Sequence, residues 1–153
     1  MNIGLADILS EAQIVTDLQA TDRWEVIDEL LANLVVTSKV KREDREAVIA
    51  AVKRREQSMS TGIGFGIGIP HATTDLVSEL TVAFGRSRHG INFDALDGQP
   101  VNLVIIFLVP QGRFQKHLHT LAEIAKLLQK SELRQALQQA PDAAAILQII
   151  RGK

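Results

Sequence analysis

An α/β fold, with a β-sheet covered by helices, is predicted for this chain by a change of hydrophobic period along its length. Residues 21–36, 42–56 and 114–130 repeat apolar side chains at helical spacing. Residues 79–88 and 100–110, which lie between these segments, are rich in Val, Ile and Phe and are typical of strands. Helical segments on both sides of strand segments favour a sandwich of helices around a sheet.

The helix predicted over residues 21–36 has both a start signal and an apolar face. Asp22 stands three positions before Glu25, which is the spacing of a capping box. The apolar face consists of Val26, Ile27, Leu30, Leu31 and Leu34. The next helix, over residues 42–56, has acidic side chains early and basic ones late, as the helix dipole favours.

The two predicted strands differ in pattern. Residues 79–88 are bounded by turn residues, whereas 100–110 are apolar without alternation, as expected of a central strand covered on both faces. Residues 114–130 return to helical spacing. We expect Ser131 to cap a short helix after them, and the Pro-Asp pair at 141–142 to open the last helix.

Composition and charge limit the classes of function. The 17 basic and 18 acidic side chains leave a net charge of -1, so we expect no binding to nucleic acid or to anionic membranes. The absence of cysteine excludes disulfides, thiolate metal sites and cysteine nucleophiles. The longest apolar run, residues 103–109, is far shorter than the ~20 residues of a membrane helix, and the N-terminus lacks a signal-peptide pattern. We therefore expect a cytoplasmic protein with a single domain over residues 1–153.

The sequence STGIGFGIGIPHAT, at residues 60–73, places a glycine at every second position from Gly62 to Gly68. The spacing G-x-G-x-x-G of a dinucleotide site does not occur, and no Lys-Ser or Lys-Thr pair directly follows the glycines, so both nucleotide-binding motifs are excluded. An extended chain would place the intervening apolar side chains on one face and bare backbone on the other. Those side chains are Ile63, Phe65, Ile67 and Ile69.

A bare glycine face allows close approach of another segment or a ligand. Pro70 would then end strand pairing, because it has no N–H to donate, and His71 would emerge beside exposed backbone donors. The alternative is a glycine-rich hairpin or bulge with an incidental surface histidine. The residues alone leave both interpretations open.

Other side chains could act with His71. On a helix, His117 shares the stripe of Leu121, Ile124 and Leu128 and is expected to face inward, whereas His119 faces outward. His89 lies in a polar segment and is expected to be exposed. Arg55 continues an apolar helical stripe and could reach inward. The opposed directions of His117 and His119 disfavour a three-histidine zinc site.

Simpler explanations exist for two of these residues. An inward histidine is often a satisfied core residue, and an inward arginine often covers apolar surface with its stem. Taken together, His71, His117 and Arg55 make a plausible set for holding a phosphoryl group.

Three blocks of the sequence carry a family resemblance. STGIGFGIGIPHA resembles the active-site signature of enzyme IIA domains of the fructose/mannitol type in the phosphoenolpyruvate-dependent phosphotransferase system (PTS). INFDALDGQPVNLVIIFLVP and KHLHTLAEIAKLL are similar to the two downstream blocks, especially in the nitrogen-regulatory branch. The resemblance covers nearly the whole chain. It implies a mixed β-sheet sandwiched between helices.

The resemblance also implies roles for individual residues. His71 matches the phosphorylated histidine, His117 the second histidine beside it, and Arg55 the active-site arginine. The residues expected to surround the phosphate or the docking site are Thr61, Gly62, Gly64, Phe65, Gly66, Pro70 and Ala72. No metal and no cofactor are expected. Phe65, Met59 and Ala72 depart from the usual Asn, Gly and Gly, and of these Phe65 and Ala72 could alter the docking rim.

The expected donor is an HPr-like phosphocarrier protein, and the other expected partners are regulated protein targets or a IIB domain. The main hypothesis is a phosphocarrier that acts as a nitrogen-PTS regulatory protein. The alternatives are a sugar-transport IIA component that passes phosphate to a IIB domain, and a non-catalytic docking module. Histidine suits such transfer because its reference pKa of ~6.5 leaves it largely neutral. We expect a backbone carbonyl to hold the Nδ1 proton of His71, so that Nε2 attacks phosphorus.

Overall fold

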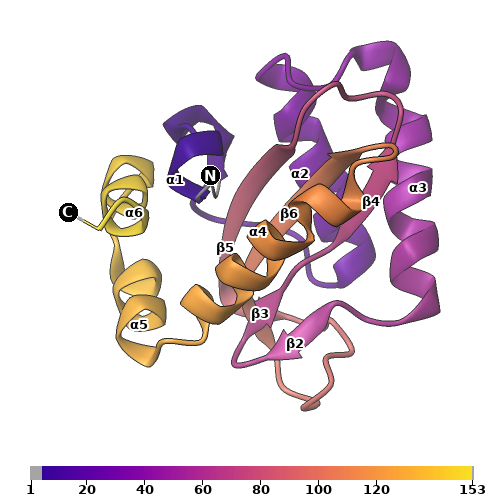
Figure 1. Ribbon diagram of the computed structural model, residues 1–153. Helices are drawn as coiled ribbons and strands as arrows, with labels where there is room; N and C mark the ends of the chain where they lie inside the picture. Colours follow the sequence, from indigo (N-terminus) through magenta and orange to yellow (C-terminus); the bar gives the residue numbers. More distant parts are fainter. Residues whose placement is uncertain (1–4, 153) are drawn as a thin grey trace.

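The computed structural model describes residues 5–152 and shows a mixed β-sheet between two groups of helices (Figure 1). The strands are β1 (Ile14–Val15), β2 (Gly62–Gly64), β3 (Ile67–Gly68), β4 (His71–Thr74), β5 (Thr81–Ile91) and β6 (Val101–Pro110). The helices are α1 (Leu5–Ile8), α2 (Arg23–Val36), α3 (Arg45–Ser58), α4 (Phe114–Leu128), α5 (Ser131–Gln139) and α6 (Ala143–Ile150). Two single 3-10 turns, Glu11–Gln13 and Arg42–Asp44, complete the assigned elements. The predicted α/β sandwich is confirmed.

The central strand β6 is buried on both faces, as its unbroken apolar sequence predicts. Its even-numbered side chains, such as Val104 and Ile106, pack into a core with α2 and α3. Its odd-numbered side chains, such as Ile105 and Phe107, pack into a second core with α1, α4, α5 and α6. Figure 1 shows these two groups of helices on opposite sides of the sheet. The alternation of side chains along a strand therefore divides one apolar run between two cores.

The sheet has the order β1-β5-β6-β3-β2, and β4 also pairs with β6. Strands β5 and β6 are antiparallel, whereas β1 runs parallel to β5. Both β3 and β4 run parallel to β6, with Ile67 beside Leu103 and His71 beside Phe107. The two short strands thus follow one another along the same edge of β6. This arrangement carries the chain directly from the glycine stretch to His71.

The glycine stretch forms a hairpin, which is the second of the two interpretations that the sequence left open, and not one continuous extended segment. Strands β2 and β3 are antiparallel and are joined by a turn in which Gly64, Phe65 and Gly66 have φ angles of +98°, +60° and +77°. Phe65 consequently leaves the shared apolar face and is 55% exposed, whereas Ile67 is fully buried. Left-handed backbone is strained for a bulky residue but not for glycine. Two of the four glycines are therefore explained by the turn.

The other two glycines allow another segment to approach closely, as the bare-face interpretation predicts. A Cβ on Gly62 would lie 2.7 Å from Cβ of Ala95, and one on Gly68 would lie 2.8 Å from the ring of Phe93. The backbone of the hairpin thus packs directly against the segment before β6. Pro70 does not end pairing with β6, since its carbonyl accepts a hydrogen bond from Phe107 N at 3.0 Å and β4 begins at the next residue.

Replacing Gly68 by alanine should destabilise the fold by about 1–3 kcal/mol, because the added methyl overlaps the buried Phe93 ring. Urea unfolding followed by circular dichroism measures this cost. In a Phe93→Leu background the ring is absent, and the same Gly68→Ala change should cost less. An equal cost in both backgrounds would show that the contact with Phe93 is not the cause.

Three residues were expected to cap the start of a helix, and two of them, at the starts of α2 and α6, do so. The carboxylate of Asp22 accepts a hydrogen bond from Glu25 N at 2.8 Å, and that of Asp142 accepts one from Ala145 N at 2.9 Å. Glu25 turns back to the hydroxyl of Thr21 rather than to Asp22, so the capping box is incomplete. Ser131 is the first residue of α5 and its side chain makes no capping bond, so its expected capping role is wrong.

Arg86 on β5 is a buried cation that the sequence interpretation did not identify. It is 1% exposed, and its Nε donates to the carbonyl of Thr16 at 3.0 Å. Its Nη1 donates to the carbonyls of Leu137 and Ala140 at the end of α5. These carbonyls have no partner within the helix, so the guanidinium satisfies them and ties α5 to the sheet.

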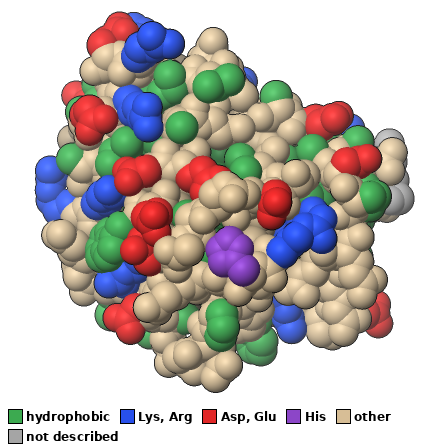
Figure 2. All heavy atoms as spheres, turned by 180° about the vertical axis from the view of Figure 1, so that it is seen from behind, with side chains coloured by type: hydrophobic (Ala, Val, Ile, Leu, Met, Phe, Trp, Pro, Cys, Tyr) green, Lys and Arg blue, Asp and Glu red, His purple; other side chains and the backbone are tan. Residues whose placement is uncertain are grey.

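Acidic and basic side chains are interspersed on the face of the molecule shown in Figure 2. This distribution accords with the near-zero net charge of the chain. Within residues 5–152, no helix is both long and apolar enough to cross a membrane.

Candidate functional site

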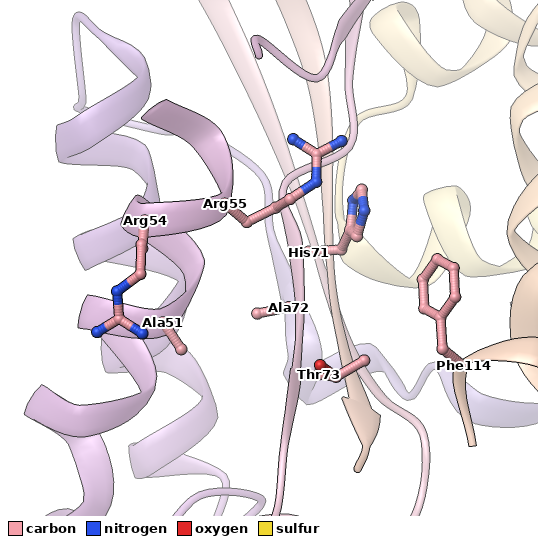
Figure 3. Close-up of a pocket in the computed structure, with 7 residues that line it drawn as sticks. All are labelled: Ala51, Arg54, Arg55, His71, Ala72, Thr73 and Phe114. Carbon is pink, nitrogen blue, oxygen red and sulfur yellow. The ribbon is translucent and has the colours of Figure 1, made fainter. Parts of the chain in front are cut away.

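A cavity of about 520 Å³ lies beside His71, where the end of α3, strand β4 and the start of α4 meet (Figure 3). Its lining residues are Ala51, Arg54, Arg55, His71, Ala72, Thr73 and Phe114. The cavity thus combines two arginines from α3, one histidine from β4 and one phenylalanine from α4. Such a concave site with few polar groups is the usual form of a binding or reaction site.

His71 is the first residue of β4 and is half-buried. Its Nδ1 lies 3.0 Å from the carbonyl oxygen of Ile69. A carbonyl oxygen can only accept a hydrogen bond, so a neutral ring in this position carries its proton on Nδ1. Nε2 makes no hydrogen bond to any residue between 5 and 152 and keeps its lone pair. The ring also stacks against Phe114, with centroids 6.3 Å apart and planes at 21°.

The side chains of the two arginines that line the cavity point in different directions. In Figure 3 the guanidinium of Arg55 extends toward the His71 ring, whereas that of Arg54 extends away from it. Nη1 of Arg55 donates to the carbonyl of Met59 at 3.0 Å, which orients the head group. The remaining N–H donors of Arg55 make no hydrogen bond within residues 5–152, and a guanidinium can bind phosphate through two parallel hydrogen bonds.

The pKa of His71 lies below the usual value for histidine. Burial is the main cause, because it disfavours the charged imidazolium, and Arg55 lowers the pKa further through charge repulsion. The hydrogen bond to Ile69 and the carboxylate of Glu56 act in the opposite direction. The ring is therefore neutral at pH 7, which is the form with a nucleophilic nitrogen.

His117 faces inward, as the helical stripe predicts, and is 5% exposed. It lies one turn beyond Phe114 on α4 but does not line the cavity. Burial lowers its pKa, and Lys116 and Arg113 lower it further. His117 is thus neutral at pH 7 and could act as a hydrogen-bond donor rather than as a cation. His119 is exposed as expected and lies 3.5 Å from a carboxylate oxygen of Glu123.

The structure brings only part of the expected phosphate-surrounding set to the cavity. Ala72 lines it, and Pro70 is buried immediately before His71. The residues of the set that do not line it are Thr61, Gly62, Gly64, Phe65, Gly66 and Pro70. Thr61 is instead buried, and the tip of the hairpin carries Phe65, whose ring lies 5.1 Å from the guanidinium carbon of Arg134.

Sequence interpretation missed two residues that touch the site or its support. Phe114 stands three positions before His117 on the same inward stripe, so the helical spacing could have identified it. Glu56 is four positions after Val52 and is 1% exposed. An acidic residue is usually predicted to be exposed, because charged residues are rarely buried unless paired, so its inward position was not predicted. His89 is exposed, as expected, and its polar segment is part of β5.

Lowered histidine pKa values predict a loss of stability in mild acid. Below about pH 6.5 the unfolded chain protonates His71 and His117 more readily than the folded chain, so the free energy of unfolding should fall as the pH drops from 7.5 to 5.5. Thermal unfolding across this range measures the effect. A His71→Gln, His117→Gln double variant should lose less stability over the same interval. Parallel curves for the two proteins would contradict the prediction.

Comparison with known proteins identifies the family. Residues 7–153 match the family described as "Phosphoenolpyruvate-dependent sugar phosphotransferase system, EIIA 2". A PTS fructose-specific EIIABC component from Bacillus subtilis is 37% identical over 146 residues, which is 95% of this chain but 23% of that protein. A nitrogen regulatory protein from Pseudomonas aeruginosa is 32% identical over 148 residues, covering 97% of this chain and 95% of that one.

A solved structure agrees with these matches. The crystal structure of the nitrogen regulatory protein IIA-Ntr from Neisseria meningitidis has a TM-score of 0.85 and 31% identity, covering 95% of this chain and 98% of that one. The chain belongs to the EIIA 2 family of the phosphoenolpyruvate-dependent sugar phosphotransferase system. The family resemblance and the mixed-sheet fold expected from the sequence are confirmed, and proteins named nitrogen regulatory protein are among the relatives.

Proposed function

We propose that the chain is a phosphocarrier that accepts a phosphoryl group on His71 from a phosphorylated HPr-like protein and acts as a nitrogen-PTS regulatory protein. The observation that carries the proposal is the environment of one ring. The carbonyl of Ile69 occupies Nδ1 of His71, while Nε2 has no hydrogen-bond partner among residues 5–152 and the ring borders an open cavity. The same proposal includes a cytoplasmic location and a single domain over residues 1–153.

The transfer step is a displacement at phosphorus. The lone pair on Nε2 of His71 forms a new N–P bond, while the N–P bond to the donor's histidine breaks and its electron pair returns to that nitrogen. The Nδ1 proton of His71 stays in place throughout. Arg55 would stabilise the charge on the phosphoryl oxygens, and neutral His117 would donate a hydrogen bond to them if the bound donor brings them within reach.

Mass spectrometry after exposure to a phosphoenolpyruvate-fed phosphocarrier relay tests this proposal, with alkaline handling that preserves phosphohistidine. We expect one added phosphoryl group, mapped to His71 by fragmentation. A chain that remains unlabelled in a relay that labels a known IIA control would leave only the docking-module alternative. Labelling at another residue would overturn the assignment of His71.

A sugar-transport role is the second candidate, and one observation favours it. The fructose-specific relative is 37% identical over 146 residues, slightly more than the 32% of the nitrogen regulatory relative. Incubation of the phosphorylated chain with a fructose-specific or mannitol-specific IIB protein distinguishes the two. Rapid onward transfer supports transport, whereas stable phosphorylation in the presence of both IIB proteins supports the regulatory role.

A further inference from the structure

Glu56, in the last turn of α3, is a buried carboxylate with three donors around it. It is 1% exposed. Its Oε2 accepts from Thr61 N at 2.9 Å, and its Oε1 accepts from the Thr61 hydroxyl at 2.6 Å. Nη1 of Arg23 lies 3.3 Å from Oε2. A carboxylate is costly to bury unless it is satisfied in this way, so the segment from α3 to the hairpin is held tightly at Thr61.

Thr61 in turn is linked to the reactive histidine through one residue. The carbonyl of Thr61 accepts a hydrogen bond from Ile69 N at 3.1 Å. The carbonyl of Ile69 lies 3.0 Å from Nδ1 of His71. The Ile69 side chain is 7% exposed and packs in the core on the α4 side of the sheet. Glu56, Thr61, Ile69 and His71 therefore form a continuous hydrogen-bond chain that crosses the base of the hairpin.

This chain of contacts leads from Glu56 to the carbonyl that faces Nδ1 of His71. The N–H of Ile69 is held by Thr61, and Thr61 is held on both its N–H and its hydroxyl by Glu56. Movement of the Ile69 carbonyl would release the Nδ1 proton. The neutral ring could then place its proton on Nε2, which removes the nucleophilic lone pair from the open side.

We propose that Glu56 is a positioning residue, which acts through Thr61 and Ile69 to hold His71 in the tautomer with the proton on Nδ1 and the lone pair on Nε2. Its consequence for phosphoryl transfer rests on the proposed function. Its consequence for the tautomer does not, and can be measured on the unphosphorylated protein.

The test is Glu56→Gln, which keeps the size of the side chain but replaces one acceptor oxygen with an amide nitrogen that cannot accept from Thr61. Long-range ¹H–¹⁵N NMR of the imidazoles at pH 8 reports the tautomer of His71. We expect the wild type to be almost entirely Nδ1-protonated and the variant to be a mixture of both tautomers. The rate of phosphorylation by the donor protein should fall about tenfold, mainly in kcat rather than in KM.

Controls separate positioning from a general loss of structure. Glu123→Gln removes an exposed carboxylate that contacts His119 on α4, and should change neither readout. Thr61→Val removes the hydroxyl that Glu56 accepts from, while Thr61→Ser retains it, so the tautomer shift should appear in the first variant and be largely absent in the second. The Thr61 pair decides the question if Glu56→Gln does not fold.

The outcomes are distinct. A folded Glu56→Gln protein with a fully Nδ1-protonated His71 and unchanged kinetics would overturn the inference, as would identical tautomers in Thr61→Val and Thr61→Ser. A shifted tautomer in a chain whose wild type is never phosphorylated would support the positioning role and reject the proposed function instead.

Discussion

Replacement of His71 by alanine is expected to abolish phosphorylation by an HPr-like donor. The change removes Nε2, the ring nitrogen that has no hydrogen-bond partner among residues 5–152, and no other histidine borders the cavity. The fold should survive, because the loss is one hydrogen bond to Ile69, worth about 1 kcal/mol, and the stacking contact with Phe114. Radiolabelling from phosphoenolpyruvate through the relay measures transfer, and circular dichroism measures folding.

His119→Ala provides the matched control for this experiment. His119 is exposed, and its ring lies near Glu123 on the outer face of α4. Its replacement removes one histidine from the chain without touching the cavity, so labelling should match the wild type. A phosphoryl group that still appears on His71→Ala, whether on His117 or elsewhere, would show that the reactive residue has been wrongly assigned.

Replacement of Arg55 by methionine should slow transfer to His71 by about 100-fold, mostly in kcat. The reason is the loss of a cation that extends toward the reacting ring and can stabilise charge on the phosphoryl oxygens. Arg54→Met removes the same charge one residue earlier, from a side chain that extends away from His71, and should cost much less. Arg55→Lys should recover part of the rate, because the charge returns without the two-pronged geometry.

The same Arg55 variant has an effect that does not depend on phosphoryl transfer. Burial is the largest cause of the lowered His71 pKa, and repulsion by Arg55 contributes to it. Arg55→Met should therefore raise the pKa of His71, and NMR titration of the imidazole measures the change. A His71 pKa that stays constant or falls in Arg55→Met would mean that the guanidinium lies farther from the ring than the structure places it.

Long, regular segments of the fold could be predicted from the sequence. Helix α2 and strands β5 and β6 have hydrophobic patterns that persist over ten or more residues, and each lies within a few residues of its predicted place. Strands β1 and β4 could not be found in this way. They contain two and four residues, and they form because a distant strand already offers hydrogen-bond partners, which is information that local sequence does not contain.

The site was predictable where chemistry depends on residue type and less so where it depends on conformation. A lone histidine after a glycine stretch drew attention to His71, and the apolar stripe of α3 indicated that Arg55 points inward. Alternating glycines, however, are compatible with both a strand and a turn. The left-handed backbone at Gly64–Gly66 shows that two glycines serve a turn. The contact of Phe93 with Gly68 shows that the strand glycines allow another segment to approach closely. The inward position of Glu56 depends on a partner that the chain reaches five residues later.

His71 stands on a strand of the main sheet, and the strand on which it stands pairs with β6 from its first residue. A ring mounted in this way cannot travel between two docking positions, as a group on a hinged arm could. If the chain passes its phosphoryl group to a IIB domain, as the sugar-transport alternative requires, the protein that delivers the group and the protein that receives it must occupy the same patch of surface at different times. The kinetics should then follow a ping-pong scheme, in which an excess of one protein inhibits turnover by excluding the other.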